Sequence, residues 1–101
     1  MEITIKDKQY TIRYTLRALF IYEQITGKTF KMQTITDEYI FIYCLILANV
    51  PDIEMSFEDF INECDTNPEL VISMQQFIAK EMEKQAAFIK DATDEDSKKK
   101  N

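Results

Sequence analysis

The sequence predicts a predominantly α-helical α+β fold, in which an N-terminal β-hairpin precedes about four helices packed around a central apolar helix at residues 37–49. Three observations predict it: period-two alternation over residues 2–14, an uncharged apolar run over residues 39–48, and apolar residues spaced three and four apart elsewhere. A chain of 101 residues is long enough for one core. We therefore expect a single compact domain over residues 1–92 and a disordered charged tail over residues 93–101.

The hairpin is expected over residues 2–14, because apolar and polar side chains alternate on both sides of a short polar turn. The apolar residues that share one face are Ile3, Ile5, Tyr10 and Ile12. A two-residue turn at Asp7 and Lys8 pairs Ile5 with Tyr10. Ile3 then lies opposite Ile12, so that like faces like on both sides of the sheet. A longer loop would shift this pairing by one residue, since Asp-Lys is not a favoured turn sequence.

The first helix is expected over residues 15–26. Thr15 supplies a hydroxyl where the alternation ends, and Gly27 is positioned for a left-handed C-terminal stop. Apolar residues occupy most positions between them, so this helix is expected to be largely covered. Its narrow polar strip contains Arg17 and Gln24. We expect the stem of Arg17 to lie along the edge of the core, in preference to a role in binding an anion.

The central helix at residues 37–49 is expected to form the core. Its start is marked by two acidic residues and a hydroxyl cap, which are Asp37, Glu38 and either Thr34 or Thr36. The apolar run over residues 39–48 is about half the ~20 residues that a helix needs to cross a bilayer. Other elements of the protein, and not lipid, must therefore cover it on every side.

Two further helices are expected at residues 56–65 and 68–92. Ser56 is a capping residue followed by acids in the first turn, while Asn67 and Pro68 provide a cap and a first-turn proline. Residues 93–101 contain no apolar side chain and are therefore expected to be disordered.

Charge and composition argue against several classes of function. The chain has 12 Lys and Arg against 18 Asp and Glu, a net charge of −6, so nucleic acid and anionic membranes are disfavoured partners. It contains no histidine and one glycine, which removes the usual general base and any Gly-rich phosphate loop. The acidic pairs Asp37-Glu38 and Glu58-Asp59 lie where helix dipoles favour negative charge. We expect no enzymatic activity, no catalytic residue, no metal and no cofactor.

The two cysteines, Cys44 and Cys64, show no metal-ligand spacing and have no neighbouring basic cluster. The first residues of the chain do not resemble a secretory leader. We expect both thiols to be buried and free, in a protein of the reducing cytoplasm.

The last helix changes character along its length. Its first part has a continuous apolar stripe made of Leu70, Val71, Met74, Phe77 and Ile78. Farther along, polar and apolar residues share the same face: Glu81, Met82, Gln85, Phe88 and Ile89. Such a mixture is typical of a partner-binding or self-associating surface. A helix end that the domain covers only in part would give the same pattern.

The hairpin runs directly into residues 14–20 (YTLRALF), and residues 23–28 (EQITGK), 36–39 (TDEY) and 56–60 (SFEDF) follow. Together these stretches resemble the small tail assembly chaperones of long-tailed phages and prophages. The resemblance covers residues 2 to about 70 and includes no catalytic signature. It implies a non-enzymatic protein of the host cytoplasm that binds the tape-measure protein and tail-tube subunits during tail assembly. The residues alone also allow a self-associating structural or adaptor module of phage or bacterial origin.

Overall fold

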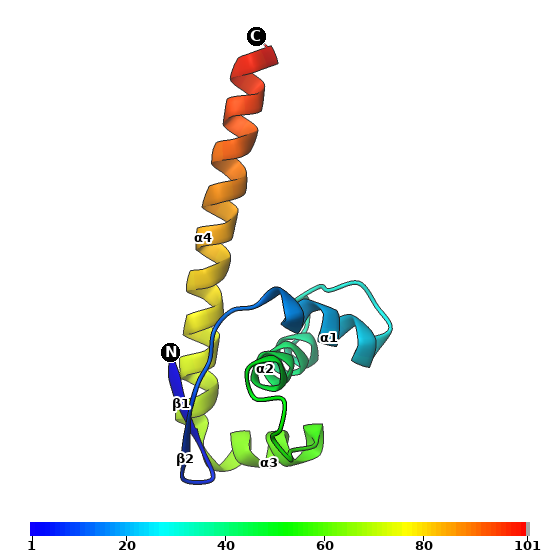
Figure 1. Ribbon diagram of the computed structural model, residues 1–101, viewed down its shortest axis with the longest axis vertical. Helices are drawn as coiled ribbons and strands as arrows, with labels where there is room; N and C mark the ends of the chain where they lie inside the picture. The colour runs from blue at the N-terminus through cyan, green and yellow to red at the C-terminus, as the bar shows by residue number, and fades with distance from the viewer. Residues whose placement is uncertain (101) are drawn as a thin grey trace.

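The computed structural model describes the backbone of residues 1–100 and the side chains of residues 1–84. It contains a two-stranded antiparallel hairpin followed by four helices, which confirms the expected α+β class (Figure 1). The elements in chain order are β1 (Glu2–Ile5), β2 (Lys8–Thr11), α1 (Leu16–Thr26), α2 (Ile35–Asn49), α3 (Phe57–Thr66) and α4 (Pro68–Lys100).

The central position of α2 is confirmed. Six consecutive residues, Phe41–Ile46, are buried on all sides of the helix. The helix begins at Ile35, two residues before the expected start, because Thr34 is the residue that caps it. The Thr34 hydroxyl accepts a hydrogen bond from the Asp37 N–H, and the Asp37 carboxylate accepts one from the Thr34 N–H, both at 3.1 Å. This reciprocal pair is a capping box.

The expected hairpin register is wrong. The turn lies at Lys6 and Asp7, whose φ angles of 49° and 67° are in the left-handed region. Ile3 pairs with Tyr10, and Ile5 pairs with Lys8, where the sequence had suggested Ile12 and Tyr10. Left-handed residues at both turn positions match the right-handed twist of the strands, and Asp tolerates this conformation. The pairing therefore shifts by two residues. A shift of two keeps every side chain on its original face.

The covered face of the hairpin accordingly agrees with the sequence. Ile3, Ile5 and Ile12 are buried, and Tyr10 is half-buried against the same core. The strand β1 packs along the first turns of α4, and the two elements lie side by side in Figure 1.

The helix α1 is covered on one side only, contrary to the expectation that it is largely covered. Ala18 and Tyr22 are buried, whereas Leu16 is 64% exposed and Phe20 56% exposed. The reason is that α2 is the principal element packed against α1, so that the opposite face has no covering layer. Thr15 precedes the helix, but its buried Oγ1 has no hydrogen-bond partner in the described part of the chain.

Gly27 ends α1 in the left-handed conformation, with φ of 68°, as the sequence predicts. Arg17 is exposed. The packing of its aliphatic stem along the edge of the core stays a prediction.

The helices α3 and α4 meet at Asn67. Ser56 and Asp59 form a second capping box at the start of α3, and Phe60 and Cys64 on this helix are buried. The helix α4 runs through Lys100 and does not end at Ala92, because neither glycine nor proline follows Pro68 to interrupt it. The backbone of residues 93–100 falls within the bounds of α4, and Asn101 lies outside the described residues. The disorder expected for residues 93–101 stays a prediction.

Candidate partner-binding surface

The first part of α4 docks on the core as expected. Leu70, Val71, Met74 and Ile78 are buried, and Phe77 is half-buried beside them. These residues recur at three and four positions, so they form a single stripe that faces α3, β1 and the other core elements. This stripe attaches the first part of α4 to the domain.

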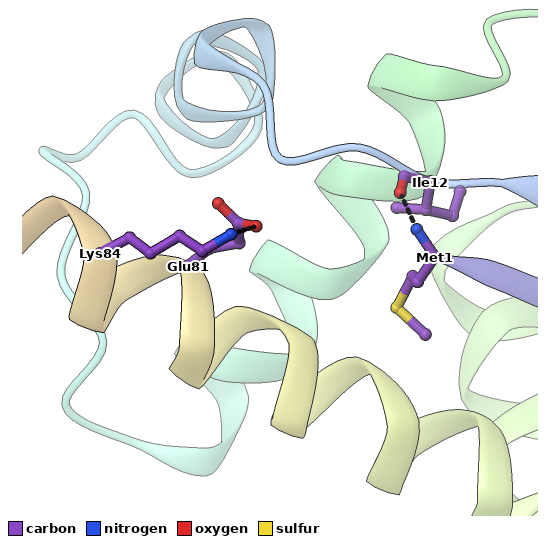
Figure 2. A network of polar contacts seen from close by, with 4 residues as sticks. All are labelled: Met1, Ile12, Glu81 and Lys84. Carbon is purple, nitrogen blue, oxygen red and sulfur yellow. Dashed lines mark hydrogen bonds and ion pairs between the residues drawn. The ribbon is translucent and has the colours of Figure 1, made fainter.

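Glu81 and Met82 lie at the end of this stripe, against the core. Met82 is half-buried and packs on the core cluster, so it is not a freely exposed anchor. The Glu81 side chain is 26% exposed, and its carboxylate pairs with the Lys84 ammonium at 3.6 Å (Figure 2). Lys84 itself is 75% exposed, so this pair lies at the solvent side of the stripe and contributes little stability.

The neighbourhood of Glu81 includes Tyr14, at the entry to α1. Burial raises the pKa of the Tyr14 phenol, and the negative charge of Glu81 raises it further. Tyr14 also packs edge-on against Phe41 of α2, with ring centroids 5.8 Å apart. Glu81 thus lies where α4 meets the central helix and the connector before α1.

The side chains of Gln85, Phe88 and Ile89 lie outside the described residues. The backbone of α4 is described there, and Figure 1 shows this half of the helix extending beyond all other elements. The protein measures 55 Å along its longest axis against 28 Å and 24 Å along the others. Of the five sequence-predicted site residues, the structure brings Glu81 and Met82 together at the base of this extension.

A second apolar surface was missed by the sequence analysis. Leu16 and Phe20 lie one helical turn apart on the exposed face of α1. Phe20 also lines a shallow surface hollow together with Arg17, Ile21 and Gln24. The element order could have indicated this surface. A helix that lies between a hairpin and one central helix has a single apolar layer to pack on, so its other face stays exposed.

The carboxylate of Asp37 holds the backbone before α2 through several hydrogen bonds. The Asp37 carboxylate accepts hydrogen bonds from the Gln33 and Thr34 N–H groups, at 3.1 Å each, and from the Tyr22 hydroxyl at 3.3 Å. These bonds, led by the Gln33 N–H, lower the pKa of Asp37. They fix the connector between α1 and α2, where Phe30 packs edge-on against Tyr22 at 5.2 Å.

Both cysteines are free and buried. Burial raises the pKa of the Cys44 thiol to about 12 and that of the Cys64 thiol to about 11. Neither side chain therefore supplies a thiolate nucleophile near neutral pH. Within the described residues, no three His, Cys, Asp or Glu side chains are grouped as a metal site requires.

No helix in the described part of the chain combines the length and the apolar character needed to span a bilayer. Comparison of the chain with family models, curated proteins and solved structures found no match.

Proposed function

We propose that this protein is a non-enzymatic tail assembly chaperone of a phage or prophage, which binds the tape-measure protein and tail-tube subunits during assembly. Two considerations support the proposal: the resemblance over residues 2 to about 70, and the form of α4. The observation that carries it is the α4 extension, a helical backbone that continues beyond the domain and bears apolar residues among polar ones.

The α4 extension suits a helical partner. Phe88 and Ile89 are adjacent apolar residues three and four positions after Gln85, a spacing that places them near one face of the helix as anchors for an amphipathic partner helix. A tape-measure protein by this interpretation offers long helical segments whose apolar stripes need cover before assembly. The net charge of −6 would keep such a complex dispersed, because like-charged complexes repel one another.

Co-expression with a fragment of the tape-measure protein tests the proposal. We expect the fragment to be insoluble alone and soluble with the full chain, and to co-elute with it at a mass equal to their sum. A fragment that stays insoluble in the presence of the chain, while the chain itself is folded, would rule out this activity.

Self-association is the second candidate function, and the exposed Leu16 and Phe20 on α1 favour it. Two copies of this surface would bury each other in a symmetric contact. Light scattering of the chain alone decides between the candidates. A stable dimer that the Phe20→Glu substitution dissociates into monomers supports self-association through α1. A monomer that binds the tape-measure fragment supports the chaperone.

A further inference from the structure

The edge of β2 that faces away from β1 carries two residues with unpaired backbone groups. At the open end of the hairpin, Met1 and Ile12 exchange both hydrogen bonds, at 2.7 Å and 3.0 Å (Figure 2 shows the second). Bonded pairs alternate along an antiparallel ladder, so the N–H and C=O groups of Gln9 and Thr11 point outward. In the described part of the chain, no residue forms a hydrogen bond with these outward groups.

The continuation of the β2 edge at Arg13 is already capped. The Asn49 side chain accepts a hydrogen bond from the Arg13 N–H at 3.0 Å and donates one to the Arg13 carbonyl at 2.8 Å, as a neighbouring strand would. On the other edge of the sheet, the Asn67 side chain donates to the Thr4 carbonyl at 3.5 Å, and α4 packs along β1. The β1 edge therefore has α4 beside it, whereas no described element forms hydrogen bonds with the β2 edge at Gln9 and Thr11.

A hollow of about 320 Å³ is lined by Lys8 and Tyr10, the β2 residues on either side of Gln9. Its apolar lining comes from Ile5 and Tyr10 of the hairpin and from Ile53 and Met55 of the α2–α3 connector. Ile5 and Tyr10 are on the covered face of the sheet. A third strand beside β2 would direct alternate side chains to that same face, and hence toward the hollow.

We propose that the open edge of β2 and this hollow bind one extended segment of a partner protein by strand addition, with a single large apolar side chain in the hollow. Hydrogen bonds to Gln9 and Thr11 supply the main-chain contact, and the hollow supplies selectivity. We call this surface the strand-addition groove. It is separate from the α4 extension and does not depend on the function proposed above.

The chemistry of the groove selects this occupant. Alternating outward N–H and C=O groups are complementary to an extended backbone, and a helix has none free to offer. The hollow is at the lower end of the ~300 to 1,000 Å³ range of small-molecule pockets, which suits one side chain.

The charges that line the hollow also define the side chain it accepts. Lys6 and Lys8 lie on the hairpin side, and Asp52 and Glu54 lie on the connector side. Two charges of each sign leave the hollow without a net charge. An uncharged apolar side chain is therefore favoured over an acidic or a basic one.

A second copy of the chain is the less suitable occupant. β2 has four residues, so a pairing of two such edges falls well short of the ~1,200 Å² that a stable interface buries. The hollow is also bounded by the hairpin on one side and by the connector on the other. One side chain of an extended segment that pairs with β2 can enter between them.

Amide hydrogen exchange on the full-length protein tests the groove with a defined probe. The probe is a capped eight-residue peptide that alternates threonine with valine and carries one central leucine. At ten times its Kd, we expect exchange at the Gln9 and Thr11 amides to slow about tenfold. The Tyr10 amide faces β1 and serves as the internal reference, because the ladder already protects it.

Matched variants separate the backbone contact from the fold. Gln9→Pro removes one outward donor and leaves the ladder intact, so we expect unchanged melting and loss of peptide binding. Gln9→Ala keeps the donor and should bind the peptide as the parent does. A probe peptide with N-methylated backbone amides should not bind the parent protein, because it cannot donate the main-chain hydrogen bonds. This probe tests the backbone contact even if the Gln9→Pro variant does not fold. A probe with alanine in place of leucine should bind at least tenfold more weakly.

Three results would overturn the proposal. The first is no change in exchange at Gln9 and Thr11 with the probe at about 1 mM, the weak end of the affinity scale. The second is equal binding of the N-methylated probe. The third is protection that appears on α1 or α4 and leaves β2 unaffected.

Discussion

Asn49 illustrates how one side chain can determine the path of a whole segment. Its amide group bonds to both backbone groups of Arg13, and it also donates to the Leu45 carbonyl at 2.8 Å. These bonds attach the end of the hairpin to the last turn of α2. In the sequence, Asn49 is only the last residue of the expected central helix, because a partner 36 residues away leaves no local pattern.

Asn49→Ala should destabilise the protein by about 1 to 2 kcal/mol, because the Arg13 backbone groups lose their partners. Urea unfolding would show a lower midpoint at unchanged slope. Asn62→Ala, at an exposed position on α3, is the matched control and should have little effect. Equal midpoints for the two variants would show that the Asn49 bonds do not stabilise the fold.

The thiols of Cys44 and Cys64 should resist modification in the native protein. With pKa values of about 12 and about 11, about one thiol in a thousand or fewer is ionised at pH 8. Titration with an aromatic disulfide reagent should therefore give slow release of thiolate in buffer and rapid release of two equivalents in denaturant. Rapid, complete reaction without denaturant would contradict the burial of both side chains.

At the scale of the elements, the sequence predicts their types and order but not all of their pairings. Period-two alternation and capping residues are local signals, so the hairpin, the α2 start near Thr34 and the stop at Gly27 could be predicted. The strand register could not be predicted. The choice between Asp7-Lys8 and Lys6-Asp7 as the turn depends on left-handed backbone angles, and neither dipeptide is a sequence typical of that conformation. The exposed side of α1 depends on tertiary packing.

Replacing the turn residues tests the register. Lys6→Asn combined with Asp7→Gly installs the favoured sequence for two left-handed positions and should stabilise the protein by about 1 kcal/mol. This gain corresponds to a melting temperature higher by roughly 4 to 8 °C. Lys8→Gly is the control, and it should lower the melting temperature because Lys8 is a paired strand residue. A lower melting temperature for the double variant together with a higher one for Lys8→Gly would instead support a turn at Asp7 and Lys8.

The two capping boxes should make stability depend on pH in the acid range. Hydrogen bonds from backbone N–H groups, those of Gln33 and Ser56 first, lower the pKa of Asp37 and of Asp59. In the unfolded chain both carboxylates have the ordinary Asp pKa of about 3.9, so they bind protons at a higher pH than in the folded protein. The stabilisation is complete above about pH 4 and is lost as pH falls through the folded-state pKa.

Thermal melting between pH 6 and pH 2 measures this effect. Asp37→Asn cannot ionise, so its melting temperature should be lower than that of the parent at pH 6 and should fall less steeply below pH 4. A variant curve that runs parallel to the parent curve would show that Asp37 does not couple proton binding to folding.

At the scale of the whole molecule, the stripe on α4 divides into a docked part and an extension. The sequence located the change near Glu81, because apolar periodicity can be counted along a single helix. It did not show that Glu81 and Met82 still belong to the docked part, since their contacts with the core and with Lys84 come from packing. The proposed partner surface therefore depends on the residues beyond Lys84.

Phe88→Asp combined with Ile89→Asp tests whether the α4 extension binds the partner, with Leu45→Asp in the buried α2 as the unfolding control. We expect the double variant to melt within about 2 °C of the parent and no longer to keep the co-expressed tape-measure fragment soluble. Leu45→Asp should unfold the domain. A double variant that unfolds in the same way, or that folds and still keeps the fragment soluble, would contradict the role of the α4 extension.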